Sequence, residues 1–400
     1  MVKFAVPYFW KLLIRRVSAF HHKWTYHASP SARNIVVIGG SFSGVHLGKR
    51  LSETVPTGHR VIVVERNSHL YYLFNFPRFS VIPGYEKQAF IPYDGLIKCA
   101  PPGALQFIQD TVTHIRKDCI QLASGGQIPF AYLAIATGSK QNFPENITAS
   151  ESREACNELR QIQKKIQAAR RIAVIGGGAL GVEISADIKS FFPQKIVTLF
   201  HSRDRLLHQF GPKLHGFVIA ALQKMGIRIV LRQRPRVLPE RNCLEWSSHR
   251  EEFDLVIPCT GQTPNSTIVT GFAPASVSQE TQRVLVKPSL QLQDARFPNV
   301  FALGDVAETH GPKMARAGYF QAEIVSENIL NMIRGNAPNK LYRPMMEVEG
   351  AIRLSLGKNA WVLHVPGSDR DLLVSGDDGK LDLGINEGWN MMRVKMEDGK

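Results

Sequence analysis

The sequence predicts an α/β protein with two Rossmann-like dinucleotide-binding domains and a small C-terminal piece. Two glycine-rich turns carry this prediction, at Gly39 to Gly44 and at Gly176 to Gly181, and each follows a short apolar, β-branched run. Glycine permits a tight strand-to-helix turn and lets the backbone approach a pyrophosphate, which then meets the amides at a helix N-terminus. Two such turns predict two dinucleotides, and a flavin with a nicotinamide is the simplest pair for an electron-transfer enzyme.

The first turn has the features of an FAD site. A strand is expected over 35–38, before the turn, and a second apolar strand over 61–64 ends in Glu65. A carboxylate at that strand end accepts hydrogen bonds from an adenosine ribose.

The second turn differs at the equivalent strand end. The strand expected over 196–200 ends in His201, Ser202 and Arg203, so the acid is missing and an arginine lies nearby. An arginine can hold a 2′-phosphate that a carboxylate would repel. This pattern favours NADPH over NADH, and the alternative is a solvated loop arginine with no ligand.

Three later strand ends complete the two-site pattern. The run 131–138 ends in Thr137 and Gly138, and 255–261 repeats that form, so each marks a crossing between the domains. The run 299–305 ends in Asp305, which can accept from the ribityl hydroxyls of a flavin or simply cap a turn. A helix starting near residue 313 is expected to direct its N-terminus at the flavin.

A further helix over 153–171 carries an apolar stripe that indicates core packing.

The basic charge is concentrated at the N-terminus. The net charge is +15, and eight Lys or Arg residues precede Glu53, the first acidic residue. Within 1–30, Trp10, Leu13, Ile14 and Val17 recur at helical spacing. This segment is interpreted as a helix on an anionic membrane surface, a mitochondrial presequence, or a helix packed on its own protein.

Composition excludes several other classes of site and protein. There is no apolar run of 18 or more residues, so no membrane-spanning helix is expected, and no metal site is expected either. The five cysteines form no close pair, which excludes the dithiol route of flavin disulfide reductases. Nucleic-acid binding is disfavoured because no reading motif accompanies the basic excess.

The order of these motifs resembles that of the two-dinucleotide-binding-domain flavoproteins. Within them the chain is most similar to the apoptosis-inducing-factor-like group, which includes the ferroptosis-suppressor quinone reductases and their fungal relatives. The similarity extends from about residue 33 to 360 and is carried by 74–79, 89–93, 197–204 and 312–315.

The resemblance implies two sets of cofactor-binding residues. FAD is expected against Gly39, Gly40, Ser41, Phe42, Ser43, Gly44, Glu65, Arg78, Val112, Thr137, Gly138 and Asp305. NAD(P)H is expected against Gly176, Gly178, Gly181, Glu183, His201, Ser202 and Arg203. Glu183 either orients the nicotinamide carboxamide or only faces the helix dipole.

Two residues depart from the family pattern. Ser41 replaces the second glycine of the first turn, which leaves less room beside the pyrophosphate, although its hydroxyl can bond a phosphate oxygen. Val2 follows Met1, so the N-myristoylation site of the better-known animal members is absent.

The expected organisation is an interrupted FAD domain with an NAD(P)H domain inside it. Residues 1–32 form the basic segment, 33–145 and 262–345 the FAD domain, 146–261 the NAD(P)H domain, and 346–400 the C-terminal piece, with no firm structure expected over 368–400. Hydride is expected to pass from NAD(P)H to the flavin, and electrons then to a quinone-type acceptor, in a membrane-associated or mitochondrial protein. The alternative function is a biosynthetic flavin oxidoreductase acting on a soluble aromatic metabolite.

Overall fold

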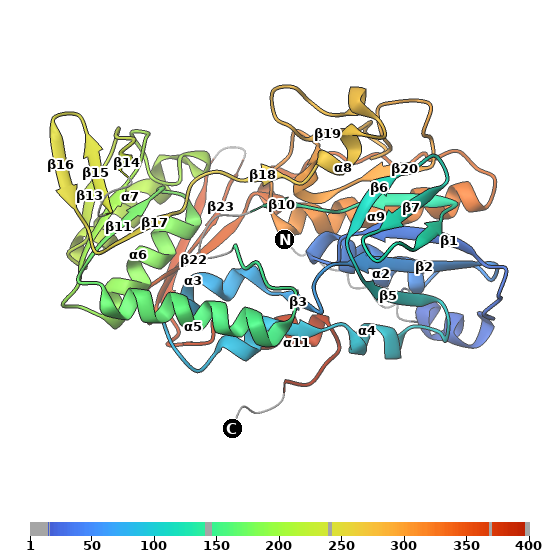
Figure 1. Ribbon diagram of the computed structural model, residues 1–400, viewed down its shortest axis with the longest axis horizontal. Helices are drawn as coiled ribbons and strands as arrows, with labels where there is room; N and C mark the ends of the chain where they lie inside the picture. The colour runs from blue at the N-terminus through green and yellow to red at the C-terminus, as the bar shows by residue number, and fades with distance from the viewer. Residues whose placement is uncertain (1–14, 16, 141–145, 239–241, 368–369, 397–400) are drawn as a thin grey trace.

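Two lobes, each built around a parallel β-sheet, make up the molecule (Figure 1). The computed structural model describes residues 15, 17–140, 146–238, 242–367 and 370–396. Trp10, Leu13 and Ile14 of the expected N-terminal stripe lie outside these residues. The α/β class predicted from the two glycine-rich turns is confirmed.

The first lobe contains a five-stranded sheet in the order β20-β9-β1-β2-β5. The strands are β1 (Arg33–Ile38), β2 (His59–Glu65), β5 (Leu105–Gln109), β9 (Tyr132–Ile135) and β20 (Val300–Ala302). Every neighbouring pair is parallel. The helices α2 (Phe42–Ser52) and α9 (Ala315–Ile333) pack against each other beside this sheet. The early strands therefore share one sheet with a strand from near residue 300.

The second lobe contains a four-stranded parallel sheet in the order β13-β12-β11-β17. The strands are β11 (Arg171–Ile175), β12 (Ile196–Phe200), β13 (Arg228–Val230) and β17 (Leu255–Pro258), and the helices are α5 (Ser152–Ala168), α6 (Ala179–Phe191) and α7 (Gly211–Lys224). The predicted helix over 153–171 ends early, because Arg171 already begins β11.

The remaining helices and strands before residue 340 are short. They are β3 (His69–Tyr71), α3 (Phe76–Phe79), β4 (Phe90–Pro92), α4 (Asp94–Cys99), β6 (Val112–Ile115), β7 (Cys119–Leu122), β8 (Gln127–Pro129), β10 (Ser139–Lys140), β14 (Arg236–Leu238), β15 (Cys243–Trp246), β16 (His249–Glu252), β18 (Thr263–Pro264), α8 (Thr267–Thr270), β19 (Val284–Leu285) and β21 (Ala307–Glu308). The antiparallel pair β10 and β18 lies between the two lobes (Figure 1).

The C-terminal piece is ordered, contrary to the expectation for 368–400 wherever the structure describes it. Its elements are α10 (Met346–Glu349), β22 (Ile352–Leu356), β23 (Ala360–Val365), β24 (Leu372–Asp377) and α11 (Asn386–Met391). The strand β22 packs on α6 of the second lobe. The α11 region returns to the first lobe, where Ile385 and Met392 are fully buried. These two apolar residues supply burial that the polar, glycine-rich composition did not suggest.

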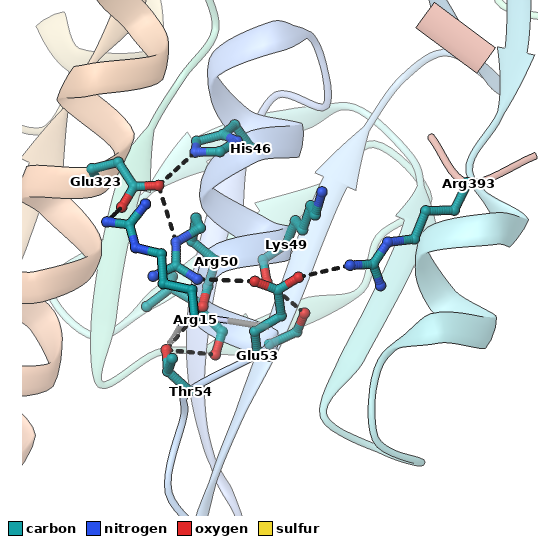
Figure 2. A network of polar contacts seen from close by, with 10 residues as sticks. Arg15, His46, Lys49, Arg50, Glu53, Thr54, Glu323 and Arg393 are labelled. Atoms are coloured by element: carbon teal, nitrogen blue, oxygen red, sulfur yellow. Dashed lines mark hydrogen bonds and ion pairs between the residues drawn. The ribbon is translucent and has the colours of Figure 1, made fainter. Parts of the chain in front are cut away.

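Both ends of the described chain are held to α2 and α9 by ion pairs (Figure 2). Arg15 contacts Glu323 of α9 at 2.5 Å, and Arg50 of α2 contacts the same carboxylate at 3.0 Å. Glu53 accepts from Arg50 at 2.9 Å and from Arg393 at 3.0 Å. No helix among the described residues is long and apolar enough to cross a membrane.

Candidate functional site: two cavities that meet

The first glycine-rich turn is held in place by Glu65 at the end of β2. The Gly40 amide donates to Oε2 of Glu65 at 2.6 Å, and the Asn67 amide donates to Oε1 at 2.9 Å. Gly39 has a φ of +103°, and a Cβ there would lie 2.4 Å from the Ala136 carbonyl oxygen. A side chain at Gly39 is therefore excluded by both conformation and space.

A cavity of about 770 Å³ opens beside this turn. Ten of the residues assigned to FAD from the sequence line it: Gly39, Gly40, Ser41, Phe42, Ser43, Glu65, Val112, Thr137, Gly138 and Asp305. Gly44 does not line it, because Gly44 closes the turn from behind, where a Cβ would lie 1.8 Å from the Gly39 carbonyl oxygen. These sequence-predicted residues therefore share one cavity, which we call the first cavity.

Arg78 lies elsewhere, so the structure gives no support for its assignment to FAD. Its guanidinium is fully buried, with Nε 2.9 Å from Oδ1 of Asp187 on α6. One terminal nitrogen donates to the Gly357 carbonyl at 2.7 Å. The physical reason is that a buried guanidinium needs a charged partner, and Asp187 supplies it inside the protein.

The first cavity also has lining residues that were not assigned to FAD from the sequence. Tyr93 is buried, and its hydroxyl donates a hydrogen bond to the Gly40 carbonyl at 2.8 Å. This bond helps to hold the first turn in place. Asn265 bridges to Thr137 by two hydrogen bonds of 2.9 Å, one in each direction. Tyr93 ends the segment 89–93 that carries the family resemblance, but neither it nor Asn265 was assigned to FAD, because their hydrogen-bond partners are far away in sequence.

Asp305 stands at the far end of the first cavity beside a lysine. Ser139 donates to its Oδ2 at 3.3 Å. Burial raises the pKa of Asp305, while the Ser139 hydroxyl and the charges of Lys313 and Arg283 act in the opposite direction. Lys313 lines the same cavity and donates to the Ala307 carbonyl at 2.8 Å. This end of the cavity therefore has both a hydrogen-bond acceptor, Asp305, and hydrogen-bond donors, Ser139 and Lys313.

The second turn repeats the geometry of the first with a histidine in place of the acid. The Gly177 amide donates to Nδ1 of His201 at 3.1 Å, just as the Gly40 amide donates to Glu65. A Cβ at Gly176 would lie 2.4 Å from the Cys259 carbonyl oxygen, and one at Gly181 would lie 1.8 Å from the Gly176 carbonyl oxygen. Because Nδ1 accepts, His201 is neutral here, and burial lowers its pKa further.

A second cavity, of about 590 Å³, opens at this turn. Of the residues assigned to NAD(P)H, Gly178 and Glu183 line it. Gly176, Gly181 and His201 form its supporting turn, while Ser202 and Arg203 are exposed on the loop beyond β12. The structure therefore separates the assigned residues into a cavity wall and an outer loop.

Glu183 connects the second cavity to the C-terminal piece. Its Oε1 accepts from the Ser355 amide at 2.9 Å and from the Ser355 hydroxyl at 3.2 Å. Burial is the main cause that raises the pKa of Glu183 to about 7, and the Ser355 amide opposes this rise. The protonated form of this carboxyl group is therefore favoured relative to that of an ordinary glutamate.

The two cavities meet at residues that line both of them. The shared residues are Leu73, Phe74, Gln262, Met314 and Ala315. Around this junction the rings of Phe42 and Phe74 have centroids 4.6 Å apart, and those of Tyr72 and Phe74 are 5.4 Å apart. A ligand reaching along the first cavity to this junction would face a ligand in the second.

The residues of the two turns fit dinucleotides. Gly138 and Gly178 each have nothing within 4 Å of where a Cβ would stand, so at each the backbone faces open space in a cavity wall.

All five cysteines are free of disulfides. No group of three or more His, Cys, Asp or Glu side chains within the described ranges could hold a metal ion.

Comparisons with known proteins agree with this geometry. Residues 33–322 match the family described as pyridine nucleotide-disulphide oxidoreductase. Fe-regulated protein 8 of Mycosarcoma maydis is 30% identical, covering 92% of this chain and 97% of that protein. Ferroptosis suppressor protein 1 of Homo sapiens is 29% identical, covering 90% and 96% respectively.

The fold is also similar to that of solved flavoprotein reductases. The sulfide:quinone oxidoreductase of Aquifex aeolicus superposes with a TM-score of 0.73 at 17% identity, covering 90% of each chain. The chain therefore belongs to the pyridine nucleotide-disulphide oxidoreductase family, is similar to the ferroptosis suppressor proteins, and is an oxidoreductase whose cofactors are FAD and NAD(P)H.

Proposed function

We propose that this protein oxidises NAD(P)H and passes the electrons through FAD to a quinone-type acceptor. The observation that carries the proposal is the junction of the two cavities, one built on each glycine-rich turn. FAD, when bound, supplies the redox chemistry by taking a hydride from the nicotinamide and returning electrons to an acceptor. We further propose 33–145 with 262–345 as the FAD domain and 146–261 as the NAD(P)H domain.

The chain's own groups bind and orient the two cofactors. The amides of the first turn and the Glu65 carboxylate would hold the pyrophosphate and adenosine ribose of FAD. Asp305 and Lys313 would hold its other half, and Gly178 would let the second backbone turn approach NAD(P)H. Glu183 would orient the nicotinamide amide from the wall of the second cavity. Close positioning of two reactants removes a large entropic barrier.

A quinone-type acceptor suits the wall of the second cavity. Tyr72, Leu73, Phe74 and Met314 present apolar and aromatic surface there, which favours a flat ring. The five cysteines form no close pair in the sequence, so there is no Cys-x-x-Cys or Cys-x4-Cys disulfide to receive the electrons. The sulfide:quinone oxidoreductase with the similar fold is named for such an acceptor.

The test is anaerobic reduction of the purified yellow protein by NADPH or NADH, followed by reoxidation with menadione. We expect the flavin absorbance to bleach with the donor and to return with menadione. Gly178→Ala should bind FAD normally but bleach at least tenfold more slowly, because its new methyl group occupies the cavity wall. Gly216→Ala on α7, where a Cβ likewise meets nothing within 4 Å, is the matched control. A folded protein that binds no FAD would refute the proposal.

A membrane-surface location, with residues 1–30 on anionic lipid, is a second proposal. In the helical residues 17–25, Val17, Phe20 and Trp24 are 64%, 67% and 75% exposed and share one face. The opposite face is held by a 2.7 Å hydrogen bond between Nε2 of His22 and the Val55 carbonyl. Such a face with basic neighbours is typical of helices that lie on anionic membranes.

Vesicle binding tests this location. Replacing Phe20 and Trp24 with serine should reduce co-sedimentation with vesicles of phosphatidylcholine and phosphatidylserine by tenfold or more, about what losing ~1.4 kcal/mol requires. Leu372→Ser on β24, also more than half exposed, is the control. Equal sedimentation of wild type and double variant would contradict the proposal, and a mature protein beginning after residue 30 would favour a cleaved presequence.

A further inference from the structure

The wall of the second cavity is completed by a segment that follows β24 in the C-terminal piece. Leu383, Gly384 and Glu387 line the cavity together with Gly178 and Glu183. Tyr72 lines it beside them, next to the junction with the first cavity. We call the part of the wall formed by Gly178 and Glu183 its nucleotide-binding side, and the part formed by Leu383, Gly384, Glu387 and Tyr72 its C-terminal side.

Helix α11 is pressed directly against the ring of Tyr72. Gly388 is buried in α11, and a Cβ there would lie 2.6 Å from Cε2 and 2.8 Å from Cδ2 of Tyr72. The φ of Gly388 lies outside the left-handed region, so a glycine is needed here for space alone. Tyr72 also contacts Phe42, the first residue of α2, at a centroid distance of 5.5 Å. The ring is therefore in contact with both α2 and α11.

The C-terminal segment itself is fixed to the first lobe at several points. The buried Asn75 side chain donates to the Asp382 carbonyl at 2.7 Å, and Nε1 of Trp389 donates to the Gln88 carbonyl at 3.0 Å. Beyond α11, Arg393 contacts Glu53 at the end of α2 (Figure 2). These contacts fix the position of α11. Because Gly388 of α11 lies against the Tyr72 ring, they also restrict where that ring can lie.

The hydroxyl of Tyr72 is available to a ligand. Within the described part of the chain it makes no hydrogen bond, whereas the side-chain amide of Asn75, which also lines this cavity, is engaged with the Asp382 carbonyl. Burial, and then the Glu387 carboxylate, raise the pKa of Tyr72 to about 12. The phenol therefore stays protonated, and so able to donate, throughout the physiological pH range.

We propose that Tyr72 donates a hydrogen bond to a carbonyl oxygen of the quinone-type acceptor, and that Gly388 is the positioning residue that lets α11 hold the Tyr72 ring in place. This inference rests on the proposed function, since it assigns the acceptor to the C-terminal side of the second cavity. A donor at that oxygen stabilises the negative charge that develops there as electrons arrive. The nucleotide-binding side is left to NAD(P)H.

Two variants test the proposal in separated half-reactions. Tyr72→Phe keeps the ring and removes only the hydroxyl, so reoxidation of the reduced protein by menadione should slow about 3- to 10-fold. Gly388→Ala should slow the same step, and the double variant should be no slower than the worse single one, because both act through one group. Bleaching by NADPH should be unchanged in each. Gly216→Ala is the control for an added methyl group in a helix.

A binding measurement supplies a readout that does not depend on turnover. By calorimetry on the oxidised protein without donor, Tyr72→Phe should weaken menadione binding by a similar factor, with unchanged unfolding temperature and FAD content. Unaltered reoxidation and binding in Tyr72→Phe would overturn the proposal. Slower bleaching by NADPH would also overturn it, because this wall would then serve the donor. Failure of wild type to reduce menadione at all would instead reject the proposed function.

Discussion

Arg78 on α3 and Asp187 on α6 form an ion pair in which neither side chain has any exposed surface, with 2.9 Å between Nε and Oδ1. The same guanidinium donates to the Gly357 carbonyl in the turn between β22 and β23. One buried cation thereby joins three segments that are far apart in the sequence: helix α3, helix α6 after the second turn, and the C-terminal piece.

Removing one member of this pair should be costly. Asp187→Ala leaves a buried guanidinium without a counter-charge, and we expect the free energy of unfolding to fall by about 3–5 kcal/mol in urea denaturation. The double replacement of both residues with leucine should cost less than this single change. Because Arg78 lies outside the first cavity, the folded fraction of Asp187→Ala should retain its FAD. Loss of FAD without loss of stability would return Arg78 to the flavin site.

The ion pairs of Glu323 should hold the N-terminal segment. Burial alone would raise the pKa of Glu323, but the His46 hydrogen bond and the charges of Arg50 and Arg15 lower it to about 2. Glu323→Gln removes that charge, and trypsin should then cleave within 15–26 about tenfold faster, since charge-assisted bonds are worth ~1.5–3 kcal/mol. Glu327→Gln on the same helix, whose contact with Lys340 is longer at 3.8 Å, should leave cleavage unchanged.

Glu183 predicts a pH dependence of stability. Its folded-state pKa of about 7 lies above the ordinary value of 4.5, so folding favours the protonated form. Its contribution to stability is complete below about pH 4.5 and is lost as the pH rises through 7. Relative to Glu183→Gln, the wild type should therefore lose roughly 3 kcal/mol between pH 4.5 and 8 in urea denaturation. Parallel stability profiles for the two proteins would contradict this expectation.

Arg203 predicts a preference for NADPH. It is exposed, and its carbonyl accepts from the Arg232 amide at 3.0 Å, so the basic loops after β12 and β13 lie side by side. Arg203→Ala should raise the Michaelis constant for NADPH about ten- to a hundredfold and leave that for NADH nearly unchanged. Arg153→Ala, an exposed arginine on α5, is the charge-matched control. Equal changes for both donors would show that this loop does not read the 2′-phosphate.

The sequence by itself determined the two strand-turn-helix units and ten of the residues that line the first cavity. Gly39 and Gly176 adopt a positive φ, which favours glycine, and Glu65 is the last residue of its strand. These features depend on neighbouring residues only, so a short stretch of sequence reveals them. The boundaries of β12 were likewise predicted correctly, because a short run of β-branched and apolar residues is typical of a buried parallel strand.

Only the tertiary structure decided what the remaining groups do. The guanidinium of Arg78 is a group that could bind a phosphate. In the folded protein it is buried beside Asp187, where it stabilises the fold. Gly388 packs against the ring of Tyr72, and burial raises the pKa of Glu183 against the opposing effect of the Ser355 amide. Each depends on a partner brought from another part of the chain by packing. The periodicity of a segment reports which of its faces is buried, but not which distant residue will lie against it.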